Sequence, residues 1–181
     1  MNLTVREMKK YEIDFMVDYF MHAAPEFLKG MGAVKNKLPK RKEWVKKLHL
    51  EHEKPYKLKE MYYVIWLINN EPHGHSNINN IVFGESATMH IHLWENLHRK
   101  SGLGFDLLHH TMPFYFNNFK LKKLISEPYS ENIAPNRLLK KVGFEFIKAY
   151  ETIPGLINFN QIVNRYEMTK EQFCGSKNQP C

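Results

Sequence analysis

A glycine-rich stretch, LHRKSGLGF at residues 97–105, contains residue types that bind phosphate groups. Its arginine and lysine supply positive charge, and its two glycines allow a sharp turn and the close approach of a bulky anion. An apolar run that predicts a helix follows, and a helix N-terminus exposes backbone N–H groups and partial positive charge. The stretch therefore predicts a pyrophosphate site. Its candidate ligands are Arg99, Lys100, Ser101, Gly102, Leu103 and Gly104.

The glycine spacing differs from that of two common nucleotide loops. The P-loop needs Gly-x-x-x-x-Gly-Lys-Ser/Thr, which is not present here. The dinucleotide loop needs Gly-x-Gly-x-x-Gly; if that pattern ended at Gly102, position 99 would be glycine, but it holds arginine. Taken alone, the stretch has an alternative interpretation as a glycine-rich helix start that binds no ligand.

The elements that must position this stretch follow from the hydrophobic pattern. Alternation through ESATMHIHLW, residues 85–94, predicts a strand with His90 and His92 on its polar face. His75 and Asn77 lie on the second arm of an expected hairpin that follows the strand at 62–68, and they are expected to share this polar face. Other strands are expected at 3–6, 62–68, 121–126, 144–150 and 164–169, and helices at 7–21, 41–53, 102–117 and 135–142. This order describes a mixed α/β layer structure.

Two blocks of the sequence carry a resemblance to a known family. Arg99-x-x-Gly102-x-Gly104 after a strand resembles the acyl-CoA pyrophosphate loop of the GNAT superfamily of N-acetyltransferases, written Arg/Gln-x-x-Gly-x-Gly/Ala. ENIAPNRLLKKVGF, residues 131–144, resembles the helix that flanks the pantetheine arm in that superfamily. The blocks are separated by one expected helix and one expected strand, and the element order agrees over roughly residues 3–170.

The resemblance implies a fold and a cosubstrate. The fold is a three-layer α/β structure, a mixed sheet with helices on both faces, in which two central strands splay around acetyl-CoA. The backbone of His92 and Leu93 is expected to hold the pantetheine and polarise the carbonyl. On the second block the expected contacts come from Asn132, Pro135 and Asn136. Pro135 stands where the family often has a small residue or serine, and Asn136 is the candidate to replace that hydroxyl.

Acetyl transfer to an amine requires a neutral amine, donors at the carbonyl oxygen and a leaving thiolate. The base should have a pKa near the working pH. His90 and His92 are candidates because an unperturbed imidazole titrates near pH ~6.5. Glu127, which follows the strand at 121–126, is another, and Tyr129 is the candidate to protonate the thiolate.

Each candidate also has a purely structural interpretation. A histidine on a sheet face is commonly just hydrogen-bonded, Glu127 can pair with Lys122 or Lys123, and the tyrosine can pack. Two His-x-His pairs, at 73–75 and 90–92, have zinc or nickel spacing, but no carboxylate or thiolate is fixed beside them. No metal is therefore expected.

A narrower resemblance covers roughly residues 86–173. Together with HIHLW, the acid-proline pair Glu127-Pro128 looks like the branch that holds the siderophore-type hydroxylysine acyltransferases and the aminoglycoside N-acetyltransferases. Several members use that acid as the base, and the siderophore enzymes also use a histidine on the central strand. The helical region that usually shapes the acceptor pocket contributes Phe27, Trp44 and Tyr56. Trp66 and Trp94 are expected in the core or the cleft wall.

Bulk properties bound the partners. With 181 residues, a single domain over 1–173 and a disordered tail over 174–181 are expected. The net charge of +7 is concentrated between Lys35 and Lys59, which hold ten basic and three acidic residues, so nucleic acid is an unlikely partner. The first residues lack a secretory apolar run, no run is long enough to span a membrane, and Cys174 and Cys181 build no disulfide framework. A cytoplasmic chain is therefore expected, with a homodimer as an open option.

The leading hypothesis is an acetyl-CoA-dependent acyltransferase acting on a primary amine or hydroxylamine of a small molecule. The acceptor is a polyamine-like metabolite, a hydroxylysine or an aminoglycoside, although the basic segment at 35–59 argues against a cationic acceptor docking there. The alternatives are a protein N-terminal acetyltransferase of the ribosomal-protein type, a non-catalytic CoA-binding domain and a basic adapter protein. A closed acceptor pocket would favour the small-molecule acyltransferase, and an open groove would favour the protein N-terminal acetyltransferase.

Overall fold

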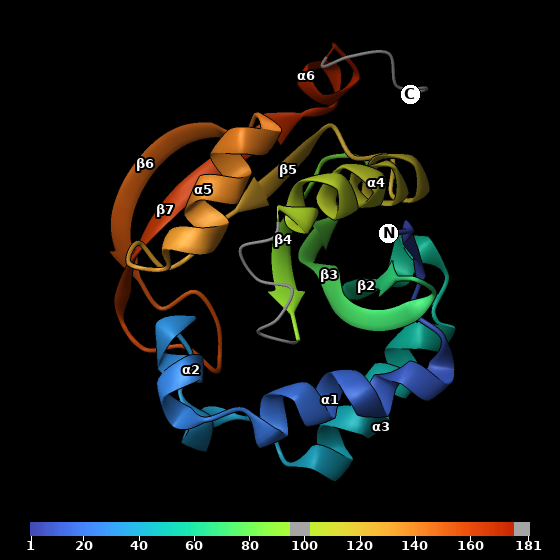
Figure 1. Ribbon diagram of the computed structural model, residues 1–181, viewed down its shortest axis with the longest axis vertical. Helices are drawn as coiled ribbons and strands as arrows, with labels where there is room; N and C mark the ends of the chain where they lie inside the picture. Colours follow the sequence, from blue (N-terminus) through green and yellow to red (C-terminus); the bar gives the residue numbers. More distant parts are fainter. Residues whose placement is uncertain (95–101, 176–181) are drawn as a thin grey trace.

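The computed structural model of the chain describes residues 1–94 and 102–175 (Figure 1). Within these residues the strands form one sheet in the order β1-β2-β3-β4-β5-β7-β6. Neighbouring strands are antiparallel, except for the parallel pair of β4 and β5. The strands are β1 (Leu3–Glu7), β2 (Met61–Ile68), β3 (Glu71–Val82), β4 (Ser86–Leu93), β5 (Lys123–Ser126), β6 (Glu145–Thr152) and β7 (Gln161–Thr169).

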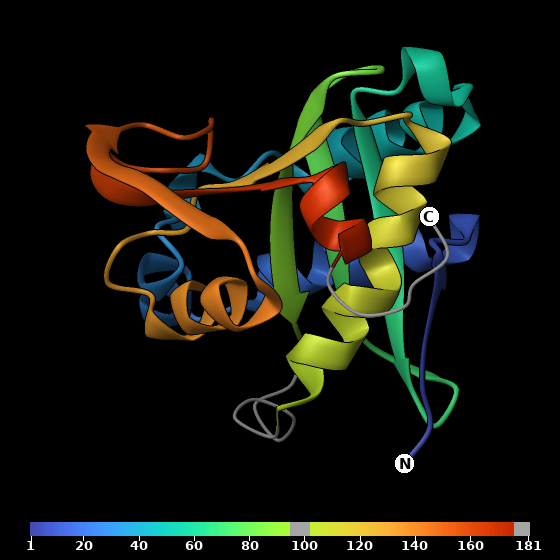
Figure 2. The same cartoon turned by 90° about the horizontal axis from the view of Figure 1, so that it is seen from above.

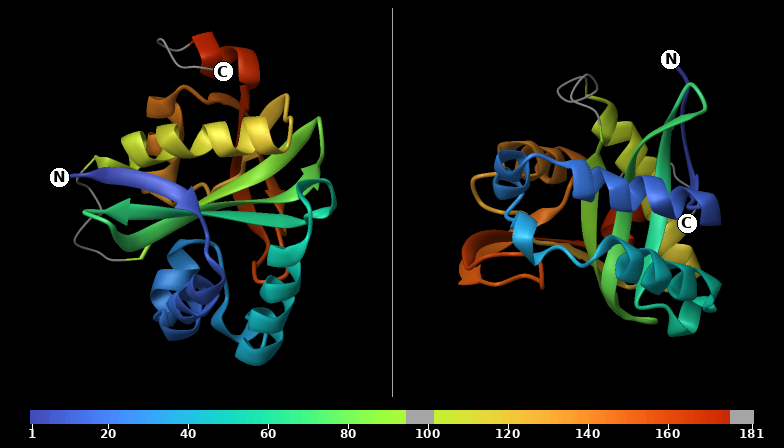
Figure 3. Two further views of the ribbon diagram at one scale, coloured as in Figure 1. Left: turned by 90° about the vertical axis from the view of Figure 1, so that its right-hand side faces the viewer. Right: turned by 90° about the horizontal axis from the view of Figure 1, so that it is seen from below.

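Helices cover both faces of the sheet, as the left panel of Figure 3 shows with α4 on one side and α1 and α3 on the other. The helices are α1 (Ile13–His22), α2 (Pro25–Gly30), α3 (Arg41–Glu53), α4 (Leu103–Asn118), α5 (Ile133–Val142) and α6 (Lys170–Gly175). Alternate residues of β2 enter two separate cores, Val64 and Trp66 beneath α4 and Ile65 and Leu67 beneath α1. This two-sided burial explains the continuous apolar run of β2. The predicted three-layer α/β fold is confirmed.

The strand pair at the centre of the sheet separates along its length. β4 pairs with β5 only from Ser86 to Thr88, although β4 continues to Leu93 (Figure 1). Just beyond the last pair, the Ser126 hydroxyl donates to the Met89 carbonyl at 3.0 Å. The second half of β4 therefore faces a gap between the two strands, which is the splay that the family resemblance implies.

Most predicted elements are present, with shifted ends. The helix at 41–53 has the predicted bounds, and α4 continues through Pro113 from its left-handed start at Gly102. The first α-helix begins at Ile13, directly after a 3-10 turn at Lys10–Glu12 in which the Lys9 N–H donates to the buried Glu12 carboxylate. The short helix α2 is not among the predicted helices; Pro25 lies in its first turn, where proline is favoured.

The C-terminal boundary also differs from the expectation. Residues 174 and 175, assigned to the tail, belong to α6, which lies beside α4 in Figure 2 and stacks Phe173 on Phe116 at 5.4 Å. Cys174 is disulfide-bonded, so the cysteines give no support to the expected cytoplasmic location. None of the helices in the described ranges combines the length and apolar character needed to cross a membrane.

Candidate active site

The open edge of β4 presents backbone groups of alternate residues. The Trp94 N–H donates to the His73 carbonyl of β3 at 2.9 Å, and pairing continues with His75 opposite His92. In an antiparallel ladder, bonding to a given neighbour alternates along the strand. The backbone of His92 therefore faces β3, whereas that of Ile91 and Leu93 faces the gap toward β5. Of the two expected backbone positions, Leu93 lies on the open side and His92 does not.

The start of α4 forms the described part of the predicted phosphate loop. Gly102 has φ +83° and precedes the first turn, and a β-carbon there would meet no atom within 4 Å. A β-carbon on Gly104 would lie 3.0 Å from the Leu138 side chain, so this glycine lets α4 approach α5 closely. Leu103 is buried in the core and anchors the turn. Arg99, Lys100 and Ser101 lie outside the described residues.

The candidate contacts on α5 divide into two kinds. The buried Asn136 amide donates to the carbonyls of Tyr129 and Asn132 at 2.9 and 2.7 Å. Its oxygen accepts from Asn164 at 2.8 Å and from the Tyr166 hydroxyl at 3.1 Å. These four hydrogen bonds occupy both donors and the oxygen of the amide, so the geometry gives no support to the prediction that Asn136 replaces a CoA-binding hydroxyl.

The other two candidates on α5 stay near the surface of the helix N-terminus. Asn132 is the N-cap residue, but its side chain makes no capping bond, and both Asn132 and Pro135 are partly exposed. Both therefore remain candidates for the cosubstrate contact.

His90 and Glu127 lie on opposite sides of the gap. The His90 Nε2 lies 3.1 Å from Oδ1 of the Asn79 side-chain amide, so Nε2 carries the proton and donates to that oxygen. Burial lowers the pKa of His90 to about 4, and the nearby Glu127 carboxylate opposes that shift. The ring is therefore neutral near pH 7 and is a weak base there. Burial therefore removes the advantage that an imidazole usually has as a proton acceptor near neutral pH, and Glu127 stays a candidate beside it.

Glu127 is held by partners from the far strands. Arg165 Nη1 and the Tyr150 hydroxyl bind its Oε1 at 2.8 and 2.6 Å. Lys122 and Lys123, the partners in the alternative structural interpretation, instead pair with Glu85 and Glu167. Arg165 and Tyr150 were missed because β7 and β6 bring them to β5 from far along the chain.

Tyr129 lies between Glu127 and α5. Its ring packs edge-to-face on Phe159 with centroids 5.6 Å apart, and a hydrogen bond to Glu131 raises the pKa of Tyr129. The hydroxyl therefore keeps its proton at neutral pH and can act as a donor.

The other predicted histidine enters an aromatic cluster under α1. The His92 ring stacks on the buried His75 ring with centroids 4.7 Å apart and meets Phe20 edge-on at 5.1 Å. Beside this cluster lies a cavity of about 900 Å³, and its lining includes Tyr19, Phe27 and Trp94. Trp94 is thus a cleft-wall residue, as expected. Trp66 is a core residue, with its indole N–H on Thr111 at 2.8 Å.

The expected pocket residues separate in the structure. Phe27 lines the cavity, whereas Trp44 packs on Phe20 at 5.3 Å and is not part of the lining. Tyr56 lines a smaller cavity beside Glu7. Among residues 1–94 and 102–175, no group of three or more histidine, cysteine or acidic side chains is arranged to hold a metal ion.

A bridge joins the α2 segment to the β6–β7 loop. Val34 N–H donates to Ile157 O at 2.8 Å, and the side chains of Asn158 and Gln161 donate to Gly32 O at 2.8 and 3.0 Å. Gly32 has φ +81°, and a β-carbon there would lie 2.0 Å from the Gln161 amide oxygen. Residues 32–34 and 157–161, here called the bridge, tie the helical layer beside the cavity to the far end of the sheet.

The lowered pKa values of His75 and His90 predict a pH-dependent stability. Burial lowers the pKa of His90 to about 4 and that of His75 well below its usual value. Because both pKa values are lower in the folded chain, the unfolded chain binds more protons between about pH 4 and 6.5. The stabilisation is complete above pH ~6.5 and is lost as the pH falls, by about 1.4 kcal/mol per pH unit for each histidine.

Urea unfolding at pH 7 and pH 5 measures this dependence. His90→Asn should make the pH dependence of the free energy of unfolding shallower by about one proton. His110→Asn, on the surface of α4, is the control and should leave it unchanged. An unaltered slope in His90→Asn would show that this imidazole is not buried in its neutral form.

Comparisons with known proteins agree with this architecture. A family model described as "Acetyltransferase (GNAT) domain" matches residues 2–145. No curated protein sequence matches the chain. Three similar solved structures are an aminoglycoside acetyltransferase, AAC(6')-Ib, in complex with coenzyme A and kanamycin, a spermidine N-acetyltransferase from Vibrio cholerae in complex with CoA and spermine, and RimL, a ribosomal L7/L12 alpha-N-protein acetyltransferase in complex with coenzyme A.

The similarity to these structures extends over nearly the whole chain. The aminoglycoside enzyme has a TM-score of 0.74 at 16% identity and covers 98% of this chain and 100% of its own. The spermidine enzyme has a TM-score of 0.75 at 15% identity, covering 96% and 98%. RimL has a TM-score of 0.77 at 14% identity, covering 95% and 96%. At these identities the likeness establishes the fold.

Proposed function

The chain belongs to the GNAT family of N-acetyltransferases, and on this basis we propose that it transfers an acetyl group from acetyl-CoA to a primary amine or hydroxylamine of a small molecule. The observation that carries the proposal is the gap between β4 and β5. It lies between the start of α4 on one face of the sheet and the aromatic cavity beside α1 on the other. The cosubstrate and the acceptor can then meet at the gap from opposite faces.

Acetyl-CoA supplies the thioester, and residues of the chain bind and orient it. The turn at Gly102 and the start of α4 bind its phosphate groups, and Asn132 and Pro135 flank the pantetheine. Backbone groups of Ile91 and Leu93 donate and accept hydrogen bonds along the open edge of β4, where a developing oxyanion is stabilised.

Glu127 accepts the proton that the amine must lose before or during attack. Its Oε1 carries both the Arg165 and the Tyr150 contacts, which fix the carboxylate beside the gap. Tyr129 returns a proton to the departing thiolate. Arg165 and Tyr150 are positioning residues in this scheme, because each acts through Glu127.

A small-molecule acceptor is favoured over a protein N-terminus by the bridge. A protein substrate needs an open groove that admits an extended chain. Here the Gly32 carbonyl and the Val34 N–H are both engaged by the β6–β7 loop, which closes that side of the acceptor region. The RimL structure has the same fold, but shared fold alone does not transfer its substrate.

The proposed function is tested by amine-dependent release of CoA thiol from acetyl-CoA, with mass spectrometry of the amine product. Acceptors should include small primary amines, hydroxylamines and a short peptide with a free N-terminus. Release that depends on a small amine, with one acetyl group added to it, is the expected result. Acetylation of the peptide alone would replace the proposal with the protein-acetylating alternative.

Opening the bridge should impair the acceptor side alone. Gly32→Ala adds a β-carbon that collides with Gln161 at a left-handed backbone position. We expect kcat/KM for a small amine to fall by about tenfold to a hundredfold, because the acceptor wall shifts. The Kd for acetyl-CoA should be unchanged.

Gly84→Ala is the matched control for this variant. It introduces the same backbone strain, at φ +80°, where a β-carbon meets no atom within 4 Å. Equal losses in the two variants would show that strain, and not the bridge, causes the effect.

A further inference from the structure

The lining of the cavity beside α1 includes several aromatic rings. Tyr19 of α1 meets Phe27 of α2 edge-on, with centroids 6.1 Å apart. The Tyr19 ring also lies 6.4 Å from Trp94, at an interplanar angle of 33°. Phe15, 58% exposed, and Tyr11, 62% exposed, continue the lining toward the surface. These rings offer apolar area and aromatic faces, which attract a single cation as well as an apolar body.

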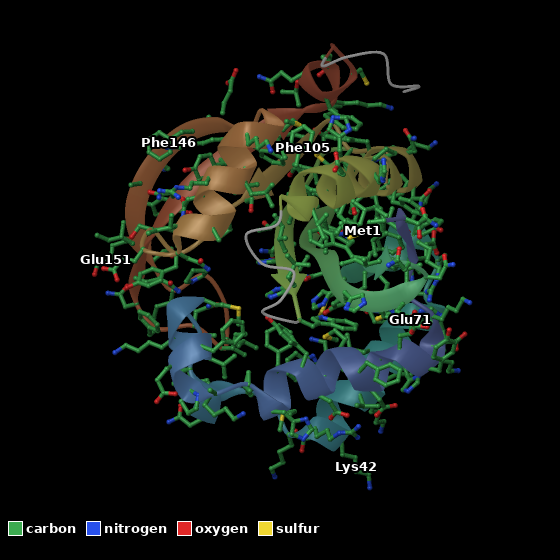
Figure 4. The ribbon with its side chains drawn as sticks, in the orientation of Figure 1. Met1, Lys42, Glu71, Phe105, Phe146 and Glu151 are labelled. Carbon is green, nitrogen blue, oxygen red and sulfur yellow. The ribbon has the colours of Figure 1, made fainter. Side chains whose placement is uncertain are left out.

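The described lining holds few charged side chains, and most of them form ion pairs with residues outside the cavity lining. Asp18 pairs with Arg41 of α3, at 2.8 Å from Oδ1 to the guanidinium Nε. Arg6 is held by the buried Glu12 carboxylate through two contacts of 2.7 Å. Of the lining carboxylates that the structure describes, Glu71 alone forms no ion pair with another described residue. Figure 4 shows it beside α1, where β3 begins. This lining can match one positive charge, not the several charges of a polycation.

A hydrogen bond to the buried His75 ring fixes the orientation of the Trp94 side chain in the cavity wall. The Trp94 indole N–H donates to His75 Nδ1 at 2.8 Å, and the His75 side chain is fully buried. Because Nδ1 accepts, the neutral ring carries its proton on Nε2. Burial lowers the pKa of His75 well below its usual value, so this acceptor persists across the physiological pH range. Stacking on His92 at 4.7 Å holds the plane of the ring.

We propose that the cavity selects an acceptor with one amino group on an aromatic or branched alkyl body, and that His75 is the positioning residue that sets the Trp94 wall for it. This inference rests on the proposed function. In the transfer, a bond forms between the amine nitrogen and the acetyl carbon, and the carbon–sulfur bond of the thioester breaks. The amine loses one proton to Glu127, and the thiolate leaves and takes up one proton.

The class of acceptor is tested on the wild-type chain with acetyl-CoA. The panel is phenethylamine and isoamylamine against spermidine and kanamycin, at matched concentrations. We expect kcat/KM to be at least about tenfold higher for the two monoamines, since the aromatic walls contact their whole body. Turnover that favours spermidine or kanamycin, or acetyl-CoA binding without turnover of either monoamine, overturns the inference. Binding of acetyl-CoA is measured separately. If the chain binds acetyl-CoA, failure with the monoamines rejects only the acceptor class; if it does not bind, the proposed function itself fails.

Variants test the role of His75. Trp94→Ala should raise the KM for phenethylamine by about tenfold, with kcat changed by less than about threefold. His75→Ala should raise the same KM, and His75→Asn should restore it, because the asparagine oxygen can replace Nδ1 as the acceptor. Trp44→Ala, outside the lining, is the control for loss of a tryptophan. Equal KM values in the wild type, His75→Ala and His75→Asn would overturn the positioning role of His75. If a variant fails to fold, the panel of amines on the wild-type chain still decides the acceptor class.

Discussion

Gly102→Asp should weaken acetyl-CoA binding at least about a hundredfold. The substitution places a negative charge at the start of α4, where the helix favours anions, and it forces a side chain into a left-handed position at φ +83°. A like charge added within contact distance of a pyrophosphate costs several kcal/mol, and about 2.7 kcal/mol corresponds to a hundredfold change in Kd. Isothermal titration with acetyl-CoA measures the change.

The sequence offers a matched control for this variant. Gly84→Asp has nearly the same backbone conformation, at φ +80°, and the same open surroundings, but lies in the turn between β3 and β4. It should bind acetyl-CoA as the wild type does. If Gly102→Asp also retains wild-type affinity, the start of α4 does not bind the phosphate groups.

Glu127→Gln should lower kcat by about a hundredfold to ten-thousandfold, the usual contribution of a positioned general base. The amide can still accept hydrogen bonds from Arg165 and Tyr150, so the variant changes the chemistry more than the shape of the site. The Kd for acetyl-CoA should change by less than about threefold, since binding the cosubstrate uses other groups. Single-turnover kinetics with saturating amine separate the two effects.

Glu167→Gln distinguishes loss of the base from loss of an ion pair. Glu167 binds the same Arg165, at 2.6 and 2.8 Å, but contributes no proton transfer in the proposed scheme. Its kcat should stay within a few fold of the wild type (on the order of 1 kcal/mol for a partly buried pair). If Glu127→Gln keeps full turnover, the proton acceptor is another group, and His92 is the next candidate to test.

Local sequence patterns predicted the elements that carry the site. The bounds of α3 and the two-sided burial of β2 follow from residue spacing over a few turns or pleats. Gly102 at the start of α4 and Gly143 at the end of α5 both adopt the left-handed conformation, which glycine tolerates because it has no β-carbon. These features depend on interactions within a short stretch of chain, which a pattern can record.

The interactions that shape the site join distant parts of the chain and leave no local signal. Glu127 meets Arg165 across 38 positions, and the bridge joins Gly32 to Gln161 across 129. Asn136 illustrates the same limit, since its position in the second block suggested a ligand contact, whereas four hydrogen bonds from the surrounding fold occupy its amide. Phe146, labelled in Figure 4, lies on the edge strand β6 and is 52% exposed although it is a large apolar residue.

The most direct test of the central claim is thermal unfolding of the purified protein with and without acetyl-CoA, using NAD and ATP as controls. A ligand present at about 100 times its Kd adds roughly 2.7 kcal/mol to the free energy of unfolding. We expect acetyl-CoA to raise the midpoint temperature of unfolding and NAD and ATP to leave it unchanged. An unchanged midpoint with acetyl-CoA, in protein whose circular dichroism shows it to be folded, would contradict the assignment of the gap between β4 and β5 as an acetyl-transfer site.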